Sequence, residues 1–290
     1  MQLKGLGVFA FLDSLSINDA AALAKSIEKL GYEALWFTEG PGGRDALVQA
    51  AYLLNRTERL VIGSGVASVW ARAPLTMASG AWTNAEASGG RFVLGIGINN
   101  PQSVAMRGGS YSKPLAYMAE YVDKLKTFEY SAAGAPPAPS IVIGAQNNRM
   151  LQLAGEQTDG ALTYFVTPEH TARARGLLGP QRRLLVEQAV ILERDAARAR
   201  LCARNYMAFY LAIANYGKFI ASLGFDAIDL AGGGSDRLVD AIVAWGDEAR
   251  IRARLEEHSR AGADHVCILP LDPAGGRRPD LRTLEALAPS

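Results

Sequence analysis

Short apolar segments alternate with helical segments along almost the whole 290-residue chain. Eight of these segments have the length and the continuous apolar character of strands buried on both faces. They span residues 3–9, 33–38, 59–66, 91–98, 140–144, 160–166, 188–193 and 264–269. Because parallel strands must be joined by crossovers, usually helical ones, this alternation predicts an all-parallel sheet covered by helices.

Both an open doubly wound sheet and a closed eight-stranded barrel satisfy this alternation. A barrel of this kind needs roughly 250 residues, and modest insertions account for the rest of this chain. The sequence therefore predicts one α/β domain over residues 1–290, folded as a (β/α)8 TIM barrel. Its extra length lies in a helical insertion between the seventh and eighth strands, within residues 195–260, interrupted at Gly224 and at residues 232–234.

The charge balance argues against nucleic-acid binding. The chain has 30 Lys and Arg residues against 29 Asp and Glu residues, so no basic field attracts a polyanion. Its 2 cysteines are too few for a disulfide framework or a cysteine-rich zinc site. No apolar run reaches the ~20 residues of a membrane-spanning helix, and the apolar N-terminal segment ends at Asp13 without a cleavage pattern. We therefore expect a cytoplasmic protein that does not bind membranes.

The carboxyl ends of the predicted strands are where a barrel gathers functional residues. In this chain they carry amides, aromatic rings and small residues, and few groups that titrate. This combination suits a flat ligand with polar edges better than it suits hydrolysis. Glu39 is the one carboxylate at a strand end among apolar residues. Both an ion pair across the barrel mouth and a functional role are open for it.

The three histidines do not form a catalytic or metal-binding set in the sequence. His170 lies in the first turn of the helix after the sixth strand, where surface and capping roles are more frequent than catalysis. His258 lies in a charged helical segment, so we expect it to be exposed, and His265 begins the eighth strand at the end of the barrel that serves stability. With no HExxH motif and no G-x-S-x-G serine turn in the chain, we expect no metal site.

Glycines mark two further segments. Gly95 and Gly97 form a lone G-x-G without the third glycine of a dinucleotide-binding fingerprint. Residues 144–149 (GAQNNR) connect the fifth strand to a helix, and small residues with free backbone amides at that place suit a phosphate group. An ordinary strand-to-helix connection is equally compatible with that segment.

Three motifs in order along the chain, EKLGYEALWFTEG, RLVIGSGVASVWARAP and EASGGRFVLGIG, carry a family resemblance. The chain resembles the luciferase-like monooxygenase superfamily over nearly its whole length. It looks most like the branch of probable oxidoreductases that use the deazaflavin coenzyme F420. The resemblance implies a barrel that holds a tricyclic redox cofactor at the carboxyl ends of its strands.

The resemblance also assigns the cofactor-binding positions. In the family the third strand ends in a bulge, frequently with a non-prolyl cis peptide, that lies behind the middle ring of the cofactor. The matching positions here are Ser64, Gly65, Val66 and Ala67. The phosphate loop of the family matches the end of the fifth strand, at Gly144, Ala145, Gln146 and Asn147.

The catalytic positions follow the family less closely. Glu39 matches the acidic residue beside the ring, and Asn99 and Asn100 match positions that contact the ring edge or the tail. Many relatives have histidine where this chain has Gly40, and close relatives have Ser-His in place of Asn99–Asn100. Glu39 and Asn100 are therefore the catalytic candidates, Asn99 is a cofactor-binding candidate, and no residue is identified as the acid–base group.

The resemblance implies hydride transfer between F420 and a small organic substrate. Phe9, Phe11, Trp70 and Phe165 are the apolar side chains expected near that substrate. Two alternatives stay open: an FMN-dependent monooxygenase that acts with oxygen, and a non-catalytic flavin or deazaflavin binder. A homodimer is compatible with the family.

Overall fold

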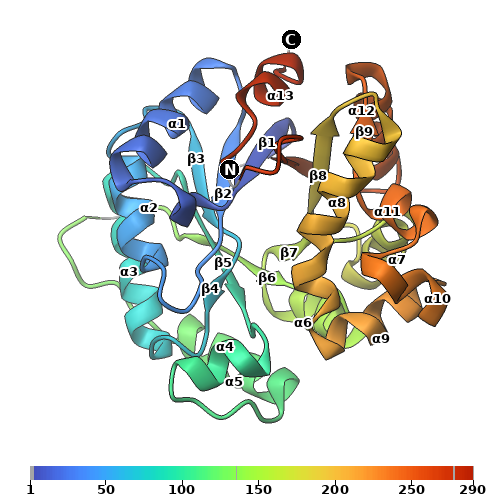
Figure 1. The fold of residues 1–290 in the computed structure, drawn as a ribbon. Helices are drawn as coiled ribbons and strands as arrows, with labels where there is room; N and C mark the ends of the chain where they lie inside the picture. The colour runs from blue at the N-terminus through green and yellow to red at the C-terminus, as the bar shows by residue number, and fades with distance from the viewer. Residues whose placement is uncertain (1–2, 135, 277, 290) are drawn as a thin grey trace.

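The computed structural model describes residues 3–134, 136–276 and 278–289. Eight parallel strands form a closed barrel in the order β10, β1, β2, β3, β5, β6, β7 and β8, and β8 pairs again with β10 (Figure 1). These strands are β1 Leu6–Ala10, β2 Ala34–Phe37, β3 Val61–Ser64, β5 Phe92–Gly97, β6 Ser140–Gly144, β7 Gly160–Thr163, β8 Arg183–Leu192 and β10 His265–Pro270. The predicted TIM barrel is confirmed.

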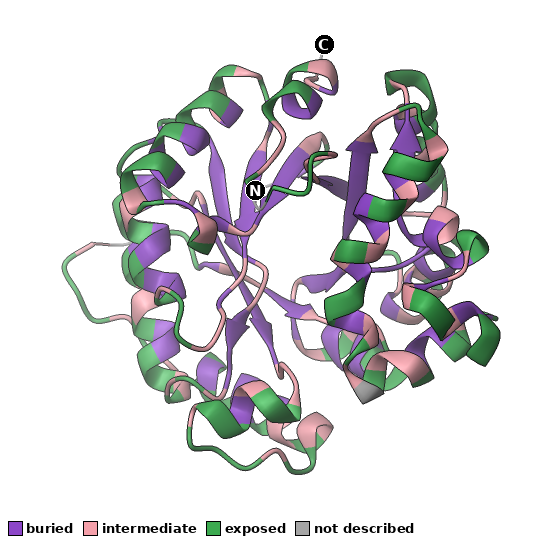
Figure 2. Cartoon of the chain, viewed as in Figure 1, coloured by how far each residue is buried: buried purple, intermediate pink, exposed green. Residues whose placement is uncertain are grey.

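Helices surround the strands, which are buried, and turn their own exposed faces outward (Figure 2). In α1, for example, Leu23, Ala24 and Ile27 are buried at helical spacing and the positions between them are exposed. The helices around the barrel are α1 Ile17–Lys29, α2 Ala46–Leu54, α3 Pro74–Ser88, α4 Pro101–Met106, α5 Pro114–Lys126, α6 Asn148–Gln157, α7 Pro168–Leu178, α12 Glu248–Arg260 and α13 Leu281–Ala286. No helix within the described ranges is long and apolar enough to cross a membrane.

The extra length follows β8, as predicted, but it is not entirely helical. It consists of α8 Ala196–Leu211, α9 Ala214–Ser222, α10 Ala227–Leu230, α11 Asp236–Ile242 and a short strand, β9 Ala244–Gly246. The Arg200 guanidinium donates to both carboxyl oxygens of Asp240, at 3.0 and 2.6 Å, and to Asp236 at 2.6 Å. These contacts hold α8 against α11, so α8 has a fixed position beside the barrel mouth.

In this region the predicted start of one strand was wrong, and a second strand was not predicted. β8 begins at Arg183, five residues before the predicted start at residue 188, because the charged Arg182 and Arg183 obscure the apolar pattern. Both arginines bind backbone or hydroxyl groups at the base of the barrel, where Arg183 Nη1 donates to Ser140 Oγ at 3.2 Å. β9 has only three residues, too few to show any periodicity, and extends the sheet by pairing with the end of β8.

The prediction that His258 is exposed was also wrong. Its ring is fully buried between α12, α7 and β8. Nε2 donates to Gln188 Oε1 at 2.8 Å, and Nδ1 accepts from Thr171 Oγ1 at 2.8 Å. The charged residues around His258 lie on the outer face of α12, whereas His258 lies on the inner face with Ile251 and Leu255. Burial lowers the pKa of His258 to about 3, so the ring is neutral.

We expect the contribution of His258 to stability to depend on pH. Its folded pKa of about 3 lies below the unfolded value near ~6.5, so this stability is present above pH ~6.5 and is lost as the pH falls toward 3. The advantage of the wild type over His258→Gln in unfolding free energy should shrink by up to about 1.4 kcal/mol per pH unit below that value. Urea unfolding of both proteins, followed by circular dichroism from about pH 7 to about pH 5, measures the difference. A difference that stays constant over this range would contradict the expectation.

Candidate active site

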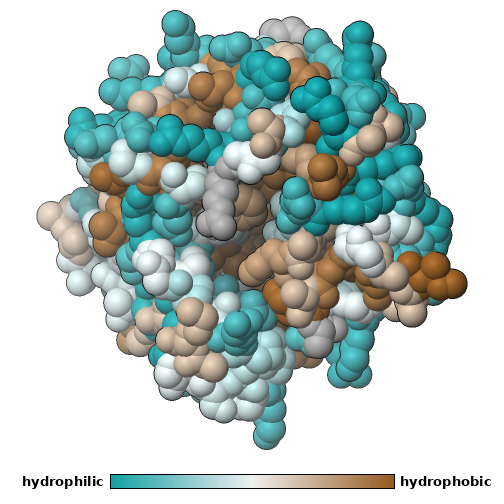
Figure 3. Space-filling model, viewed as in Figure 1, coloured by the Kyte–Doolittle hydropathy of each residue, from teal (hydrophilic) through white to brown (hydrophobic). Residues whose placement is uncertain are grey.

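A cavity of about 950 Å³ opens at the carboxyl ends of the barrel strands. Figure 3 shows the molecule hollowed near the centre of this face. Residues at the ends of β1, β2, β3, β5, β6 and β7 line it, together with α8, α9 and the segment before α13. This volume lies in the range of cavities that bind cofactors and small molecules, roughly 300–1,000 Å³.

One wall of the cavity is a break in the third strand. β3 ends at Ser64, the Gly65–Val66 peptide bond is cis, and the chain resumes pairing with β5 as the short strand β4, Ala67–Ser68. Ser64 is tied to β5 by two hydrogen bonds, since its Oγ donates to Gly95 O at 2.8 Å and accepts from Gly95 N at 3.0 Å. The predicted bulge and cis peptide are thus present at the predicted residues.

Glycines surround this break because larger residues would not fit. A Cβ on Gly97 would lie 2.2 Å from Val66 Cγ2, and one on Gly144 would lie 2.9 Å from Val66 Cγ1. A Cβ on Gly65 would lie 2.6 Å from the Phe9 ring. The Val66 side chain thus packs toward β5 and β6. Gly65, Val66, Gly97 and Gly144 all line the cavity, and we call this surface the glycine shelf.

Two asparagines lie at the end of β5. Asn99 has a left-handed backbone, with φ of 50°, and its Oδ1 is buried without a hydrogen-bond partner among the described residues. Asn100 caps α4, because its Oδ1 accepts from Ser103 N at 2.9 Å. Both side chains line the cavity. An amide does not titrate, so Asn100 can bind a polar ligand edge but cannot serve as an acid or base.

The predicted phosphate loop, residues 144–147, is fixed by two hydrogen bonds of Gln146 to neighbouring residues. Gln146 Nε2 donates to Tyr164 O at 2.7 Å, and His170 Nε2 donates to Gln146 O at 2.8 Å. His170 is buried, so it supports the loop instead of occupying the surface position that its place at a helix start suggests. Asn147 is the N-cap residue of α6 and makes no side-chain capping bond. Of the predicted cofactor-binding residues, Ser64 and Ala67 lie behind the cavity and the others line it.

Of the two roles that the sequence left open for Glu39, the structure shows the ion pair at the barrel mouth. Its carboxylate pairs with Arg72 and accepts from Ala46 N at 3.1 Å and from Ser68 N at 2.7 Å. The side chain is buried. Asp45 also pairs with Arg72, at 2.5 Å. These contacts connect β2, α2 and β4, so Glu39 fixes the rim next to the glycine shelf.

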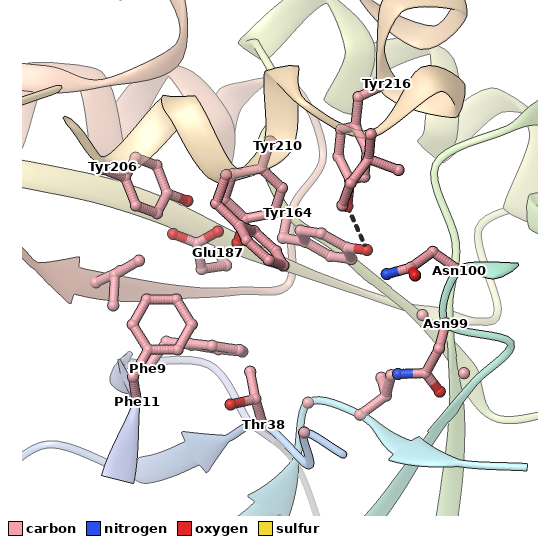
Figure 4. A pocket seen from close by; sticks show the side chains of 18 of the residues that line it. Phe9, Phe11, Thr38, Asn99, Asn100, Tyr164, Glu187, Tyr206, Tyr210 and Tyr216 are labelled. Carbon is pink, nitrogen blue, oxygen red and sulfur yellow. Dashed lines mark hydrogen bonds between the residues drawn. The ribbon is translucent and has the colours of Figure 1, made fainter. Parts of the chain in front are cut away.

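The opposite wall of the cavity is aromatic, and sequence reasoning missed it. Tyr164 follows β7, Tyr206 and Tyr210 lie on α8, and Tyr216 lies on α9 (Figure 4). Tyr216 Oη donates to Tyr164 Oη at 2.7 Å. We call these four residues the tyrosine wall. The spacing of Tyr206 and Tyr210, four residues apart on one helix face, is the signal that could have indicated it.

Glu187 is the second residue that sequence reasoning missed. It lies in the middle of β8, lines the cavity beside the tyrosine wall and is 3% exposed (Figure 4). Burial raises its pKa to about 8, and a hydrogen bond from the Phe165 backbone acts in the opposite direction. A glutamate inside an otherwise apolar strand, RLLVEQAVIL, is the signal for it, but the late predicted start of this strand excluded residue 187.

The four predicted apolar neighbours of a substrate divide into two pairs. Phe9 and Phe11 line the cavity. Trp70 instead stacks on Tyr117, with ring centroids 3.9 Å apart, and its Nε1 donates to Ile98 O at 2.9 Å. Phe165 is buried behind Tyr210, with ring centroids 4.5 Å apart. No group of three or more His, Cys, Asp and Glu side chains that could hold a metal ion occurs in the described part of the chain.

The fold and the site define a barrel protein with a ligand-sized cavity at the end where barrel enzymes carry out chemistry. The chain belongs to the luciferase-like monooxygenase family, whose model matches residues 6–265. It is 25% identical over 302 residues to the 5,10-methylenetetrahydromethanopterin reductase of Methanolobus tindarius. The matched region covers 88% of this chain and 91% of that protein. The reductase of the same name from Archaeoglobus fulgidus is 27% identical over 228 residues, 70% of this chain and 69% of that protein.

Solved structures share the fold. The coenzyme F420-dependent tetrahydromethanopterin reductase of Methanopyrus kandleri superposes with a TM-score of 0.76 at 18% identity and covers 99% of this chain and 98% of its own. An F420-dependent secondary alcohol dehydrogenase, solved with an F420–acetone adduct, has a TM-score of 0.76 at 16% identity. The superposition covers 98% of this chain and 97% of that one. The oxygenating constituent of a Pseudomonas putida 3,6-diketocamphane monooxygenase, solved in complex with FMN, has a TM-score of 0.73 at 14% identity. The superposition covers 99% of this chain and 97% of that one.

The glycine shelf predicts a specific steric coupling. Gly97→Ala should destabilise the protein by about 1–3 kcal/mol, because the new methyl group would lie 2.2 Å from Val66 Cγ2. Val66→Ala removes that atom, so the double variant should recover most of the stability lost by Gly97→Ala. Gly176→Ala is the matched control, because no atom lies near the position of its Cβ. Chemical unfolding of the wild type, the two single variants and the double variant measures the coupling, and additive losses in the double variant would contradict it.

Proposed function

We propose that this protein is an oxidoreductase that binds coenzyme F420 in the cavity and transfers a hydride between the deazaflavin and a small organic substrate. The observation that carries the proposal is the glycine shelf, a surface of small residues beside a cis peptide at the carboxyl end of the third strand. Membership of the family supports it, as do the names of the methanopterin reductases that the chain resembles.

The cavity fits a tricyclic ring in shape and in polarity. Cβ atoms at Gly97 and Gly144 have no room beside Val66, so the shelf stays flat enough for a ring to stack on it. At its edge, the buried Asn99 Oδ1 has no partner among the described residues and would accept from an N–H of the ring. The deazaflavin supplies the hydride chemistry at its C5 carbon when it is bound.

The residues of this chain would bind and orient the two reactants. The shelf would support one face of the ring, and Asn99 and Asn100 would contact its polar edge. The Ala145 N–H donates to Leu162 O at 3.0 Å, so the backbone amides after Ala145, at the start of α6, would bind the phosphate. Phe9 and Phe11 would exclude water from the substrate side. Because the Glu39 carboxylate is saturated by Arg72 and two backbone amides, we propose that it positions the rim and does not transfer protons.

FMN is the second candidate cofactor, since a structural neighbour with the same fold was solved with FMN. Such a protein would act with oxygen as a monooxygenase. Titration with each cofactor separates the two proposals, because F420 fluorescence changes on binding and bound FMN colours the purified protein yellow. The homodimer and the cytoplasmic location stay predictions.

Loss of the Asn99 side chain should weaken F420 binding about tenfold, the equivalent of one hydrogen bond of about 1.4 kcal/mol. Asn99→Gly is the informative variant, because glycine accepts the left-handed backbone at this position without strain. Asn55→Ala, an exposed residue at the end of α2, is the control and should bind as the wild type does. Fluorescence titration gives the dissociation constants. If the wild type does not bind F420, the proposed function is wrong, and binding of FMN alone would favour the second candidate.

A further inference from the structure

The cavity is lined by a buried acidic side chain, Glu187, that forms no ion pair with any residue the structure describes. Glu187 is 3% exposed, and its Oε1 has no hydrogen-bond partner among the described residues. None of the ion pairs formed by described residues includes Glu187. Its contrast with Glu39 is clear, because Glu39 is equally buried but is paired with Arg72 and two amides. A carboxyl group left in this state at the wall of a ligand-sized cavity is available to a ligand.

The groups that face Glu187 are neutral, and the Phe165 backbone N–H gives its carboxyl group a hydrogen bond. Tyr164 comes from the β7 side, Tyr206 and Tyr210 from α8, and Cys267 from β10, where it is the register partner of Glu187. Burial raises the pKa of each of these four groups, so none of them carries charge near neutral pH. With no cation beside it, the carboxyl group keeps its proton, in agreement with its pKa of about 8.

We propose that Glu187 is the general acid of this site and that the substrate is an uncharged carbonyl compound. The protonated carboxyl group donates a hydrogen bond to the carbonyl oxygen and gives up its proton when hydride reaches the carbonyl carbon. This inference rests on the proposed function, because it assumes that a reduced deazaflavin supplies the hydride. Glu187 supplies the acid–base group that the family motifs did not identify in this chain.

The step balances as follows. The carbonyl carbon receives a hydride with its electron pair from the reduced deazaflavin, and a C–H bond forms. The π electrons of the carbonyl move to oxygen, which takes the proton of Glu187, so the product is an alcohol and the residue becomes a carboxylate. The oxidised deazaflavin has lost its second hydrogen as a proton to solvent, and the carboxylate regains a proton from solvent. In the reverse direction the carboxylate accepts the proton of the alcohol.

The surroundings of Glu187 restrict the substrate class. The tyrosine wall and Phe9 line the cavity with aromatic rings, which favours an apolar or ring-containing body next to the carbonyl group. A substrate carboxylate at the same place would lie in a buried region beside Glu187 without a cation to balance it. We therefore expect neutral ketones and aldehydes to bind, and carboxylate analogues of the same size to be rejected.

Infrared difference spectroscopy of the purified protein tests the protonation state without any turnover. The wild type should show the C=O stretch of a protonated carboxylic acid that titrates with a pKa of about 8, and Glu187→Gln should lack this band. Glu193→Gln is the matched control, because Glu193 follows the same strand outside the cavity and should leave the band unchanged. Absence of a Glu187 band that titrates near this pH would overturn the proposal.

Ligand binding tests the substrate class. Cyclohexanone, 2-cyclohexenone and benzaldehyde should each shift the Glu187 band in the wild type, because the carboxyl O–H gains an acceptor, and cyclohexanecarboxylate should not. No shift with any of the three carbonyl probes, or an equal shift with the carboxylate, would overturn the inference.

Kinetics with F420 separates this inference from the proposed function. Glu187→Gln should bind F420 within about twofold of the wild type, but its single-turnover rate of carbonyl reduction should fall about 100-fold or more. Glu193→Gln should react at the wild-type rate. If Glu187→Gln binds F420 and reduces the carbonyl substrate at the wild-type rate, the role of Glu187 is overturned and the proposed function still stands. A wild type that does not bind F420 would instead overturn the proposed function.

Discussion

Closure of the barrel between β8 and β10 is the constraint on which the site depends. Six residues of β10 pair in register with six of β8, from His265 with Leu185 to Pro270 with Val190. This pairing turns an open parallel sheet into a ring, so the carboxyl ends of strands far apart in sequence face a common cavity. It also places Glu187 next to Cys267 in the ring interior, where water is excluded and only neutral groups surround the carboxyl group.

The two walls of the cavity arise from different physical causes. The glycine shelf comes from backbone geometry, because the break after Ser64 turns the Val66 side chain toward β5 and β6 and leaves room there only for glycine. The tyrosine wall comes from the insertion, because the Arg200 contacts to Asp236 and Asp240 fix α8 beside the barrel mouth. A planar cofactor suits the first wall, and a substrate with an apolar body suits the second.

The barrel and the break in the third strand could be predicted from the sequence because both have strong local signals. Buried parallel strands form continuous apolar runs, and the motif around Gly65 matches a known family. For the tyrosine wall the sequence carries only a partial signal: the spacing of Tyr206 and Tyr210 indicates a shared helix face, but the place of that face and of Tyr216 relative to the barrel depends on how α8 and α9 pack. His258 was misplaced for a similar reason, since its charged neighbours in sequence lie on the other face of α12. Local composition therefore predicts well where helices and strands form, but it predicts poorly which faces of those helices pack against the barrel.

The proposed role of Glu187 would explain how a site that looks incomplete in its sequence motif can still hold a proton donor. The family resemblance implies a histidine after the acidic residue of the second strand, where this chain has Gly40, and Glu39 itself is saturated by Arg72 and backbone amides. A proton donor must satisfy only two physical conditions: it must hold a proton at neutral pH and lie within reach of the reacting atoms. A carboxyl group acquires the first property from burial without a cation, and any barrel strand can provide the second. If Glu187 has the proposed role, the proton donor has moved from the rim after β2 to the interior of β8 without a change in fold, and the tyrosines beside Glu187 contribute to the burial that keeps it protonated.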